Sequence, residues 1–291
     1  MAEGGIDAPV TAVRDVVRRA LAEDLEPLGD LTGALLDPAA YATASVVART
    51  AGVVAGRSPA REAFAAVDAT IEVEWLLDDG SAVAAGDVVA RVRGRLAPIL
   101  AAERTALNFL CHLSGIATMT RRFVDEAATG GPARIWDTRK TTPGLRAVEK
   151  AAVRAGGGAN HRGSLSEWVL LKDNHLLGTD ISSAVTRARR RWPGRTVEVE
   201  ADRLDQLEEA VAAGADVVLL DNMSPDLVRA CVEARGDAGR PLLEVSGGVT
   251  LATVARFAGT GVDFISVGAL THSAPALDLG LDVEPTGGEG G

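Results

Sequence analysis

Long apolar segments and cysteines are scarce in this sequence. No apolar run approaches the roughly 20 residues needed to span a bilayer, and the N-terminus MAEGGIDAPV has no basic start followed by an apolar block. The two cysteines, Cys111 and Cys231, lie far apart in apolar surroundings, with the spacing of neither a disulfide framework nor a metal site. We therefore expect buried free thiols and a cytoplasmic protein without a membrane segment.

Net positive charge is also lacking. The formal net charge of −10 over 291 residues argues against a nucleic-acid binder. Residues 134–175 are the exception, with eight Lys or Arg against four Asp or Glu. A cationic segment in an acidic chain favours small anionic substrates. A solvated basic helix face would account for Arg146, Lys150 and Arg154, which fall at helical spacing, but not for the other cations.

The first third of the chain predicts a mixed α and β structure with nothing obviously catalytic. Apolar residues at helical spacing predict a helix over Val10–Leu25. Pro98 opens a long helical stretch to Ala128, which we expect to break near Ser114-Gly115. The predicted strands are Ala42–Arg49, Ile71–Leu77 and Val88–Val92.

The rest of the chain alternates short apolar strands with amphipathic helices, and ends in a Gly-rich tail after Val283 that we expect to be disordered. Because no dinucleotide-binding glycine motif follows the first strand, this alternation favours a parallel barrel over a doubly wound sheet. The predicted helices include Asp202–Ala213, Ser224–Ala234 and Leu251–Ala258. The predicted strands are Ala133–Asp137, Trp168–Leu171, Thr196–Val199, Asp216–Leu220, Leu242–Val245 and Asp263–Val267.

Polar residues and glycines directly follow these strands. In a β/α barrel such positions share one rim, at the C-terminal ends of the strands, where catalysis occurs. One polar residue after a strand could arise by chance. Chance does not explain polar residues after six strands in succession, with both signs of charge among them. The residues are Thr138, Arg139, Lys140, Lys172, Asp173, Asn174, His175, Glu200, Asp221, Asn222, Ser246, Gly247, Gly248 and Gly268.

The cationic part of this rim is suited to binding anions. Arginine matches a carboxylate or phosphate with two parallel hydrogen bonds, and lysine supplies a point charge. Several such groups together predict a ligand with more than one anionic group, although any single arginine could form a surface salt bridge. The group comprises Arg139, Lys140, Arg162 and Lys172, with His161 and His175 nearby.

The acidic part consists of Glu200 and Asp221, with Glu198 on the same side of its strand as Glu200. Oxygen ligands without a Cys/His cluster suit Mg²⁺ held partly through substrate phosphates, and they also suit sugar hydroxyls. Glu198 could instead form a supporting salt bridge to the cations.

Glycines after the last strands form the third part. Ser246-Gly247-Gly248 and Gly268 let backbone N–H groups approach a phosphate, and His272 follows closely. The three parts together predict a phosphosugar with further phosphates and Mg²⁺, beside a polyanion. Because no nucleophile–base pair is evident, catalysis would rest on placement and charge stabilisation.

Four long segments resemble the quinolinate phosphoribosyltransferase family. They are AERTALNFLCHLSGIATMTRRFVD, IWDTRKTTPGLRAVEKAAVRAGGGANHRGSLSEWVLLKDNHLL, VEVEADRLDQLEEAVAAGADVVLLDNMSP and LEVSGGVTLATVARFAGTGVDFISVGALTHSAPALDLGLDV. The resemblance covers residues 10–283. It implies an N-terminal α/β sandwich domain over residues 1–107, with 275–291 packed against it, and an incomplete (open) parallel α/β barrel over 108–274.

The resemblance also implies a reaction. Quinolinate and phosphoribosyl pyrophosphate would give nicotinate mononucleotide, pyrophosphate and CO₂ in NAD biosynthesis, with Mg²⁺. The protein would be a homodimer in which Arg104 reaches the site of the neighbouring subunit. The residues that would hold the two quinolinate carboxylates are Arg139, His161, Arg162 and Lys172. Those around the 5′-phosphate would be Ser246, Gly247, Gly268 and His272.

Four of the residues would take part in catalysis. Glu200 and Asp221, which by resemblance face the ribose hydroxyls and Mg²⁺, can stabilise an oxocarbenium-like state. Lys140 would face the phosphates and, with Mg²⁺, stabilise the departing pyrophosphate. Lys172 would stabilise the charge that develops as the 2-carboxylate leaves.

Three positions, Gly163, Ser164 and Trp168, depart from the usual family pattern and either reshape the pocket wall or pack in the core. Other functions are open. A relative that accepts nicotinate would leave cations unpaired, which disfavours it. A lyase would use Lys172 or Lys140 as a Schiff base. A non-catalytic phosphosugar sensor would have lost part of the charged set, and none is lost here.

Overall fold

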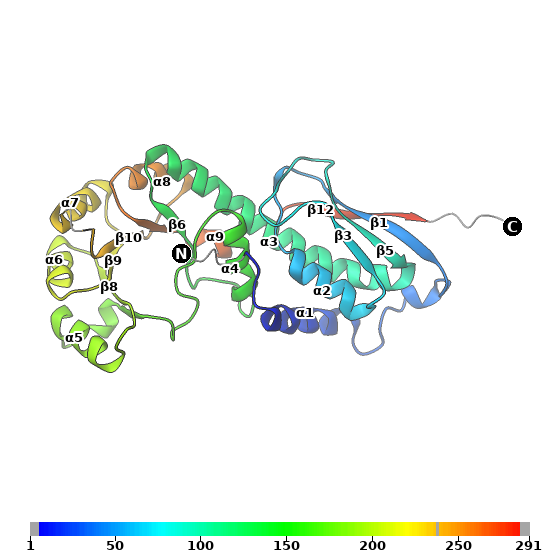
Figure 1. Ribbon diagram of the computed structural model, residues 1–291, viewed down its shortest axis with the longest axis horizontal. Helices are drawn as coiled ribbons and strands as arrows, with labels where there is room; N and C mark the ends of the chain where they lie inside the picture. Colours follow the sequence, from blue (N-terminus) through cyan, green and yellow to red (C-terminus); the bar gives the residue numbers. More distant parts are fainter. Residues whose placement is uncertain (1–5, 237–238, 286–291) are drawn as a thin grey trace. The chain divides into compact units, whose positions relative to one another are not determined.

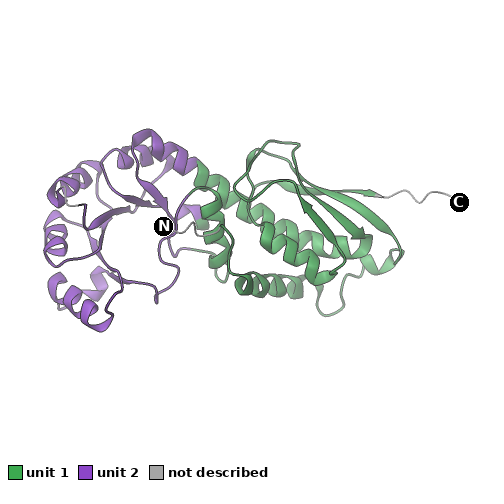
Figure 2. Cartoon of the chain, in the orientation of Figure 1, with its two compact units in different colours: residues 1–121, 141–157, 271–291 green, residues 122–140, 158–270 purple. Residues whose placement is uncertain are grey.

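The computed structural model describes residues 6–236 and 239–285. The chain divides into two compact units (Figure 2). Unit 1 comprises residues 1–121, 141–157 and 271–291, and unit 2 comprises residues 122–140 and 158–270. Both combine helices with a sheet, which confirms the predicted α/β class.

This division differs from the predicted boundary at residue 107. The long helix α3 (Leu96–Gly130) runs through both units. The predicted barrel domain includes residues 141–157, but these group with unit 1 because α4 (Arg146–Ala155) contacts α1 (Val10–Leu25). The guanidinium of Arg154 also donates hydrogen bonds of 2.9 Å to the carbonyls of two N-terminal residues.

The basic residues of helix α4 are not all solvated. Lys150 is 6% exposed, while Arg146 and Arg154 are partly exposed. Glu149 is fully buried and lies 2.8 Å from Nε2 of His112. The solvated basic-face interpretation therefore does not hold for Lys150.

Unit 1 is built on a four-stranded antiparallel sheet, with α1, α2 (Arg57–Val67) and the first part of α3 along one side (Figure 1). Alternate residues of the inner strand β1 (Tyr41–Ala48) are buried, as expected for a strand with one face on the core. The C-terminal strand, β12, pairs with β1. In sheet order the strands are β12 (Leu279–Pro285), β1 (Tyr41–Ala48), β5 (Val88–Arg95) and β3 (Glu72–Trp75). Short elements are η1 (Gly33–Leu35), β2 (Gly52–Val53) and β4 (Ala82–Val83).

Helix α3 continues without interruption through Ser114 and Gly115, so the predicted break is wrong. The Ser114 hydroxyl accepts a hydrogen bond of 2.9 Å from the amide of Ala55 and donates one of 3.1 Å to its carbonyl. A Cβ at Gly115 would lie 2.1 Å from the carbonyl oxygen of Pro275. The small residues therefore allow close packing of neighbouring chain segments inside a continuous helix.

Unit 2 is an open sheet of six parallel strands, with α5, α6, α7 and α8 in an arc on its outer side (Figure 1). β6 and β7 are its edges and do not pair in the described part of the chain, which confirms an incomplete barrel. In sheet order the strands are β6 (Arg134–Trp136), β11 (Phe264–Ser266), β10 (Leu242–Ser246), β9 (Val217–Asp221), β8 (Val197–Ala201) and β7 (Val169–Leu171). The helices are α5 (Ile181–Arg191), α6 (Leu204–Ala212), α7 (Pro225–Arg235), α8 (Leu251–Ala258), α9 (Ala269–His272) and η2 (Asp173–His175).

Three smaller expectations have mixed outcomes. Cys231 is buried and Cys111 is partly exposed, so both are free thiols but only one is buried. Within residues 6–236 and 239–285, no helix has the length and apolar character to cross a membrane. The predicted disordered tail starts after Val283, but Glu284 belongs to β12, and residues 286–291 lie outside the described part.

Candidate active site

A cavity of about 340 Å³ lies at the C-terminal ends of the strands of unit 2. We call it the rim cavity. Its position is the one predicted for a β/α barrel site, and its size suits a small ligand. Its lining residues are Thr138, Arg139, Lys140, His161, Arg162, Leu170, Lys172, Leu219, Asp221, Glu244, Ser246 and Ser266. The structure thus brings together cations that are up to 33 positions apart in sequence, with acids from other strands.

The chain after β6 fixes two of the cavity residues. Ala159 pairs with Trp136, and its amide donates a hydrogen bond of 2.8 Å to the Ile135 carbonyl. The fully buried carboxylate of Asp137 accepts a hydrogen bond of 2.9 Å from the amide of His161. His161 and the following arginine are thereby held beside β6, close to the residues that end that strand.

Arg162 is buried next to another cation. It is 6% exposed, and its Nη1 donates a hydrogen bond of 3.1 Å to the carbonyl of Trp168. Burial and the charge of Arg139 lower the pKa of the Arg162 guanidinium. Two neighbouring guanidinium groups repel each other, and an anionic ligand would offset that cost.

His161 lies against two buried carboxylates. Its Nε2 is 3.2 Å from Glu198 Oε2 and 3.4 Å from Glu244 Oε2. Trp168 Nε1 donates a hydrogen bond of 2.8 Å to Glu198, and the hydroxyl of Ser266 donates one to Glu244. Glu198 is fully buried and contacts His161 rather than solvent. Its geometry is therefore that of a supporting salt bridge.

These contacts change the protonation of the cluster. Burial alone would lower the pKa of His161, but hydrogen bonds and charges from Glu198 and Glu244 raise it to about 9. Burial and the charge of Glu198 raise the pKa of Glu244 to about 7. The pKa of Glu198 stays below its ordinary value because the contacts with His161 outweigh the effect of burial. The same three side chains could supply one ligand atom each to a metal ion, and without one His161 forms ion-pair contacts with both carboxylates.

Lys172 and Glu200 join the cationic and acidic parts of the rim. The ammonium group of Lys172 donates a hydrogen bond to Glu200, whose side chain is 14% exposed. Asp221, at the end of the neighbouring strand β9, accepts a hydrogen bond of 2.8 Å from the side chain of Asn222. His175, in contrast, accepts from the amide of Lys172 through Nδ1 and so caps the turn η2.

Gly247, the first glycine after β10, lies against Asn222. The amide of Asn222 donates a hydrogen bond of 2.9 Å to the carbonyl of Ser246, and Asn222 has a positive φ of 54°. Gly247 has a φ of +96°, and a Cβ there would lie 2.2 Å from Asn222 Oδ1. Helix α8 begins shortly afterwards, at Leu251. Its N-terminus and the glycine backbone together suit a phosphate. Gly268 follows β11 in the same unit.

Two of the predicted site residues, Arg104 and His272, belong to unit 1. Arg104 lies on α3 and lines a separate hollow of about 560 Å³ with residues of α1 and residues 142–145. His272 ends α9, and its Nδ1 is 2.6 Å from the hydroxyl of Ser273.

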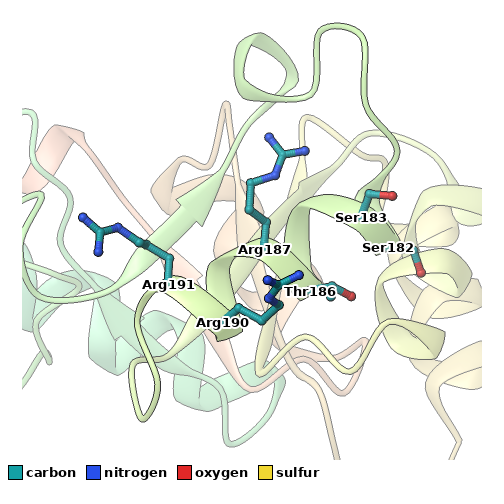
Figure 3. Close-up of a pocket in the computed structure, with 6 residues that line it drawn as sticks. All are labelled: Ser182, Ser183, Thr186, Arg187, Arg190 and Arg191. Atoms are coloured by element: carbon teal, nitrogen blue, oxygen red, sulfur yellow. The ribbon is translucent and has the colours of Figure 1, made fainter.

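A further hollow on α5 carries arginines as well (Figure 3). The side chains of Arg187 and Arg191 point in different directions there (Figure 3). Arg191 lies over the ring of Trp192 at 4.7 Å, and Arg187 donates a hydrogen bond of 3.4 Å to Thr179. These cations do not converge on one point, so the rim cavity remains the candidate site.

Known proteins resemble the chain along nearly its whole length. Residues 30–114 match the family model of the quinolinate phosphoribosyl transferase N-terminal domain, and residues 116–282 match that of the C-terminal domain. The chain belongs to the quinolinate phosphoribosyltransferase family. A relative named nicotinate-nucleotide pyrophosphorylase [carboxylating], from Mycobacterium leprae (strain TN), is 44% identical over 285 residues, covering 95% of this chain and 99% of its own.

Other members of the family are similar in sequence and in structure. A probable nicotinate-nucleotide pyrophosphorylase [carboxylating] from Bacillus subtilis (strain 168) is 42% identical, with 88% of each chain covered. The solved structure of the nicotinate-nucleotide pyrophosphorylase from Francisella tularensis has a TM-score of 0.90 at 40% identity, covering 97% of this chain and 99% of that one.

Sequence reasoning missed one charged residue of the rim cavity. Glu244 stands inside the apolar stretch of β10 and is 1% exposed, yet it contacts His161. The available signal was a single carboxylate within an apolar strand, since burying such a group requires a partner. That partner is distant in sequence, and so the pattern alone could not name it.

Proposed function

We propose that this protein is a carboxylating phosphoribosyltransferase. It would transfer the phosphoribosyl group of phosphoribosyl pyrophosphate to the ring nitrogen of quinolinate, with release of pyrophosphate and CO₂. The product would be nicotinate mononucleotide, for NAD biosynthesis. The observation that carries the proposal is the rim cavity, which is lined by four Lys or Arg side chains and His161 together with Asp221, Glu244 and Ser246, the first residue of the Ser-Gly-Gly turn. The names of the similar proteins support the same reaction.

The cations of the cavity suit an acceptor with two carboxylates. Arg139, Arg162 and Lys172 lie around one space, and the first two repel each other. A dianionic acid can pair with more than one of them. A mono-acid such as nicotinate has one negative charge fewer to offset this repulsion, which disfavours it.

The transfer needs no nucleophile from the protein, because the pyridine nitrogen attacks the anomeric carbon. A bond forms between that nitrogen and the carbon as the bond to the pyrophosphate oxygen breaks. Glu200 and Asp221, on adjacent strands, would stabilise the positive charge that develops on the ribose. Lys140 would bind the phosphates. The C–C bond to the 2-carboxylate then breaks, CO₂ departs, and the electron pair stays at C2 beside the positively charged ring nitrogen, where Lys172 would stabilise it. C2 then takes up a proton from solvent to give nicotinate mononucleotide.

The acidic residues also fit Mg²⁺. Glu200 and Asp221 offer oxygen donors from neighbouring strands, and oxygen is the ligand type that Mg²⁺ prefers when it is shared with substrate phosphates. Mg²⁺ bound there would neutralise charge on the leaving pyrophosphate.

We propose three further properties. The protein would act as a homodimer in the cytoplasm, and Arg104 of one subunit would complete the site of the other. In support, Arg104 lines an open hollow in unit 1 with polar and apolar residues of α1. Two free cysteines are compatible with a reducing compartment.

The direct test is product formation from quinolinate, phosphoribosyl pyrophosphate and Mg²⁺, with nicotinate as the parallel acceptor. We expect nicotinate mononucleotide and an equal amount of CO₂ with quinolinate, and loss of both when a chelator removes Mg²⁺. Product from nicotinate but not from quinolinate would overturn the proposed acceptor. Retention of full activity in chelator would overturn the Mg²⁺ proposal alone.

A further inference from the structure

A pair of buried carboxylates lies at the base of the rim cavity. We propose that Glu198 and Glu244 are positioning residues that hold His161 in the cavity and thereby favour an acceptor with two negative charges. This inference deepens the proposed function and rests on it. Neither carboxylate is exposed enough to bind substrate itself, since Glu198 is 0% and Glu244 1% exposed.

The ring of His161 is held on several sides. Both carboxylates converge on Nε2, at 3.2 Å and 3.4 Å, and the carboxylate of Glu198 accepts a hydrogen bond from it, so this nitrogen carries a proton. The rings of Trp136 and Trp168 meet His161 edge-on, with centroids 5.4 Å and 4.9 Å away. Because Trp168 also donates to Glu198, the carboxylate itself is held in place. The ring therefore cannot turn away from the cavity without breaking several contacts.

The carboxylates also favour the charged form of the ring. They raise the pKa of His161 to about 9, so the imidazolium persists at neutral pH and adds a positive charge to the cavity. The charged groups that face or adjoin His161 are Asp137, Arg139, Arg162, Lys172, Glu198 and Glu244. Of these, Glu198 and Glu244 touch the ring nitrogen, and Asp137 accepts from the backbone amide of His161.

A cation whose position is fixed before binding needs little reorganisation when an anion arrives. The charge of His161 should affect binding of the acceptor acid, because the phosphoribosyl side of the proposed site is formed by other residues. Loss of a positioning carboxylate should therefore raise KM for the acceptor and leave KM for phosphoribosyl pyrophosphate nearly unchanged.

The test compares Glu198→Gln and Glu244→Gln with the unaltered protein from pH 6 to pH 8.5. In Glu198→Gln, the pKa of His161 should fall toward its ordinary value of about 6.5. We expect KM for quinolinate to rise roughly tenfold at pH 8 and less than about threefold at pH 6, where the ring is protonated without help. Glu244→Gln should shift KM in the same direction by a smaller factor.

A matched control is Asp216→Asn. Asp216 directly precedes β9, and its carboxylate accepts a hydrogen bond of 2.7 Å from the amide of Val197 at the start of β8, the end of that strand away from the cavity. It disturbs the same strand without touching the cavity, so its KM values should follow those of the unaltered protein at every pH. If Glu198→Gln fails to fold, Trp168→Phe removes the indole N–H that fixes Glu198 while keeping an aromatic ring beside His161, and the His161 pKa can be read by NMR with labelled histidine.

Three results would overturn the inference: an acceptor KM raised equally at pH 6 and pH 8, equal effects on both substrates, or an unchanged His161 pKa in Glu198→Gln or Trp168→Phe. The proposed function is tested separately by turnover of the unaltered protein. The NMR measurement needs no activity, so failure of one proposal can be told from failure of the other.

Discussion

The ammonium group of Lys172 donates a hydrogen bond to the carboxylate of Glu200 and joins the cation after β7 to the acid of β8. The lysine side chain is 42% exposed, while that of the glutamate is 14% exposed. Lys172, which lines the rim cavity, can therefore meet a ligand while Glu200 stays largely buried behind it. This pair lies at the junction between the acceptor and ribose parts of the proposed site.

Removal of this lysine should slow decarboxylation. In Lys172→Ala, the charge that develops as CO₂ leaves loses its nearest cation, and we expect kcat to fall by about 100-fold or more. The measurement is release of labelled CO₂ from carboxyl-labelled quinolinate in a single turnover. Lys172→Arg, which keeps the charge, should retain part of the rate. Near-normal turnover in Lys172→Ala would contradict the role of Lys172.

A pair of glycine variants tests the phosphate side of the cavity. Gly247 and Gly248 both have positive φ, at +96° and +61°, so alanine strains the backbone at either position. Only at Gly247 would the new Cβ meet another residue, Asn222, whose Oδ1 is 2.2 Å away, whereas nothing lies within 4 Å at Gly248.

We therefore expect Gly247→Ala to raise KM for phosphoribosyl pyrophosphate by at least about tenfold, and Gly248→Ala to raise it much less. Substrate titrations of both variants at fixed quinolinate make the comparison, with thermal unfolding as the measure of folding. Equal effects of the two substitutions would show that the close approach of Gly247 to Asn222 has no part in phosphate binding.

Much of this fold can be predicted from the local pattern. The helices Val10–Leu25 and Leu251–Ala258 have the predicted bounds, because each presents an apolar stripe at helical spacing to the core. The parallel strands are also found within two residues of their predicted ends, since each is a short apolar run between polar residues.

Tertiary contacts decide what the pattern could not show. The Ser114-Gly115 pair resembles a helix break, but its small side chains serve close packing within α3. The cations of α4 resemble part of the anion site, yet they belong to unit 1, and Lys150 is buried there. Likewise Glu244 has meaning only beside His161, which is 83 positions earlier in the chain. Such pairings depend on which elements meet, and no local period encodes that.

Mixed dimers test whether Arg104 acts across subunits. Arg104→Ala and Lys172→Ala should each be nearly inactive as pure proteins. If a site takes Arg104 from the partner, a dimer with one variant of each kind contains one complete site. We expect coexpression with two affinity tags to restore roughly a quarter to a half of the activity per purified mixed dimer. Mixed dimers as inactive as the pure variants would place Arg104 within its own subunit's site or outside catalysis.

The protonated carboxyl of Glu244 makes stability depend on pH. Its pKa in the folded protein is raised to about 7, from an ordinary value of 4.5. The folded protein therefore holds this proton more tightly than the unfolded chain does. The resulting stabilisation is complete below pH 4.5 and is lost as pH rises through 7. The raised pKa of His161 has the same sign, with its loss between pH 6.5 and about 9.

Glu244→Gln has no proton to release at this position, so its unfolding free energy should vary less with pH between 5 and 7.5. The unaltered protein should lose on the order of 1 to 3 kcal/mol relative to the variant over that interval. Urea unfolding at several pH values measures the difference, and Asp216→Asn again serves as the comparison, since its carboxylate caps the amide of Val197 and lies outside the cluster. If the difference is constant with pH, or grows in favour of the unaltered protein as pH rises, Glu244 is already ionised in the folded protein. The raised pKa of Glu244 would then be contradicted.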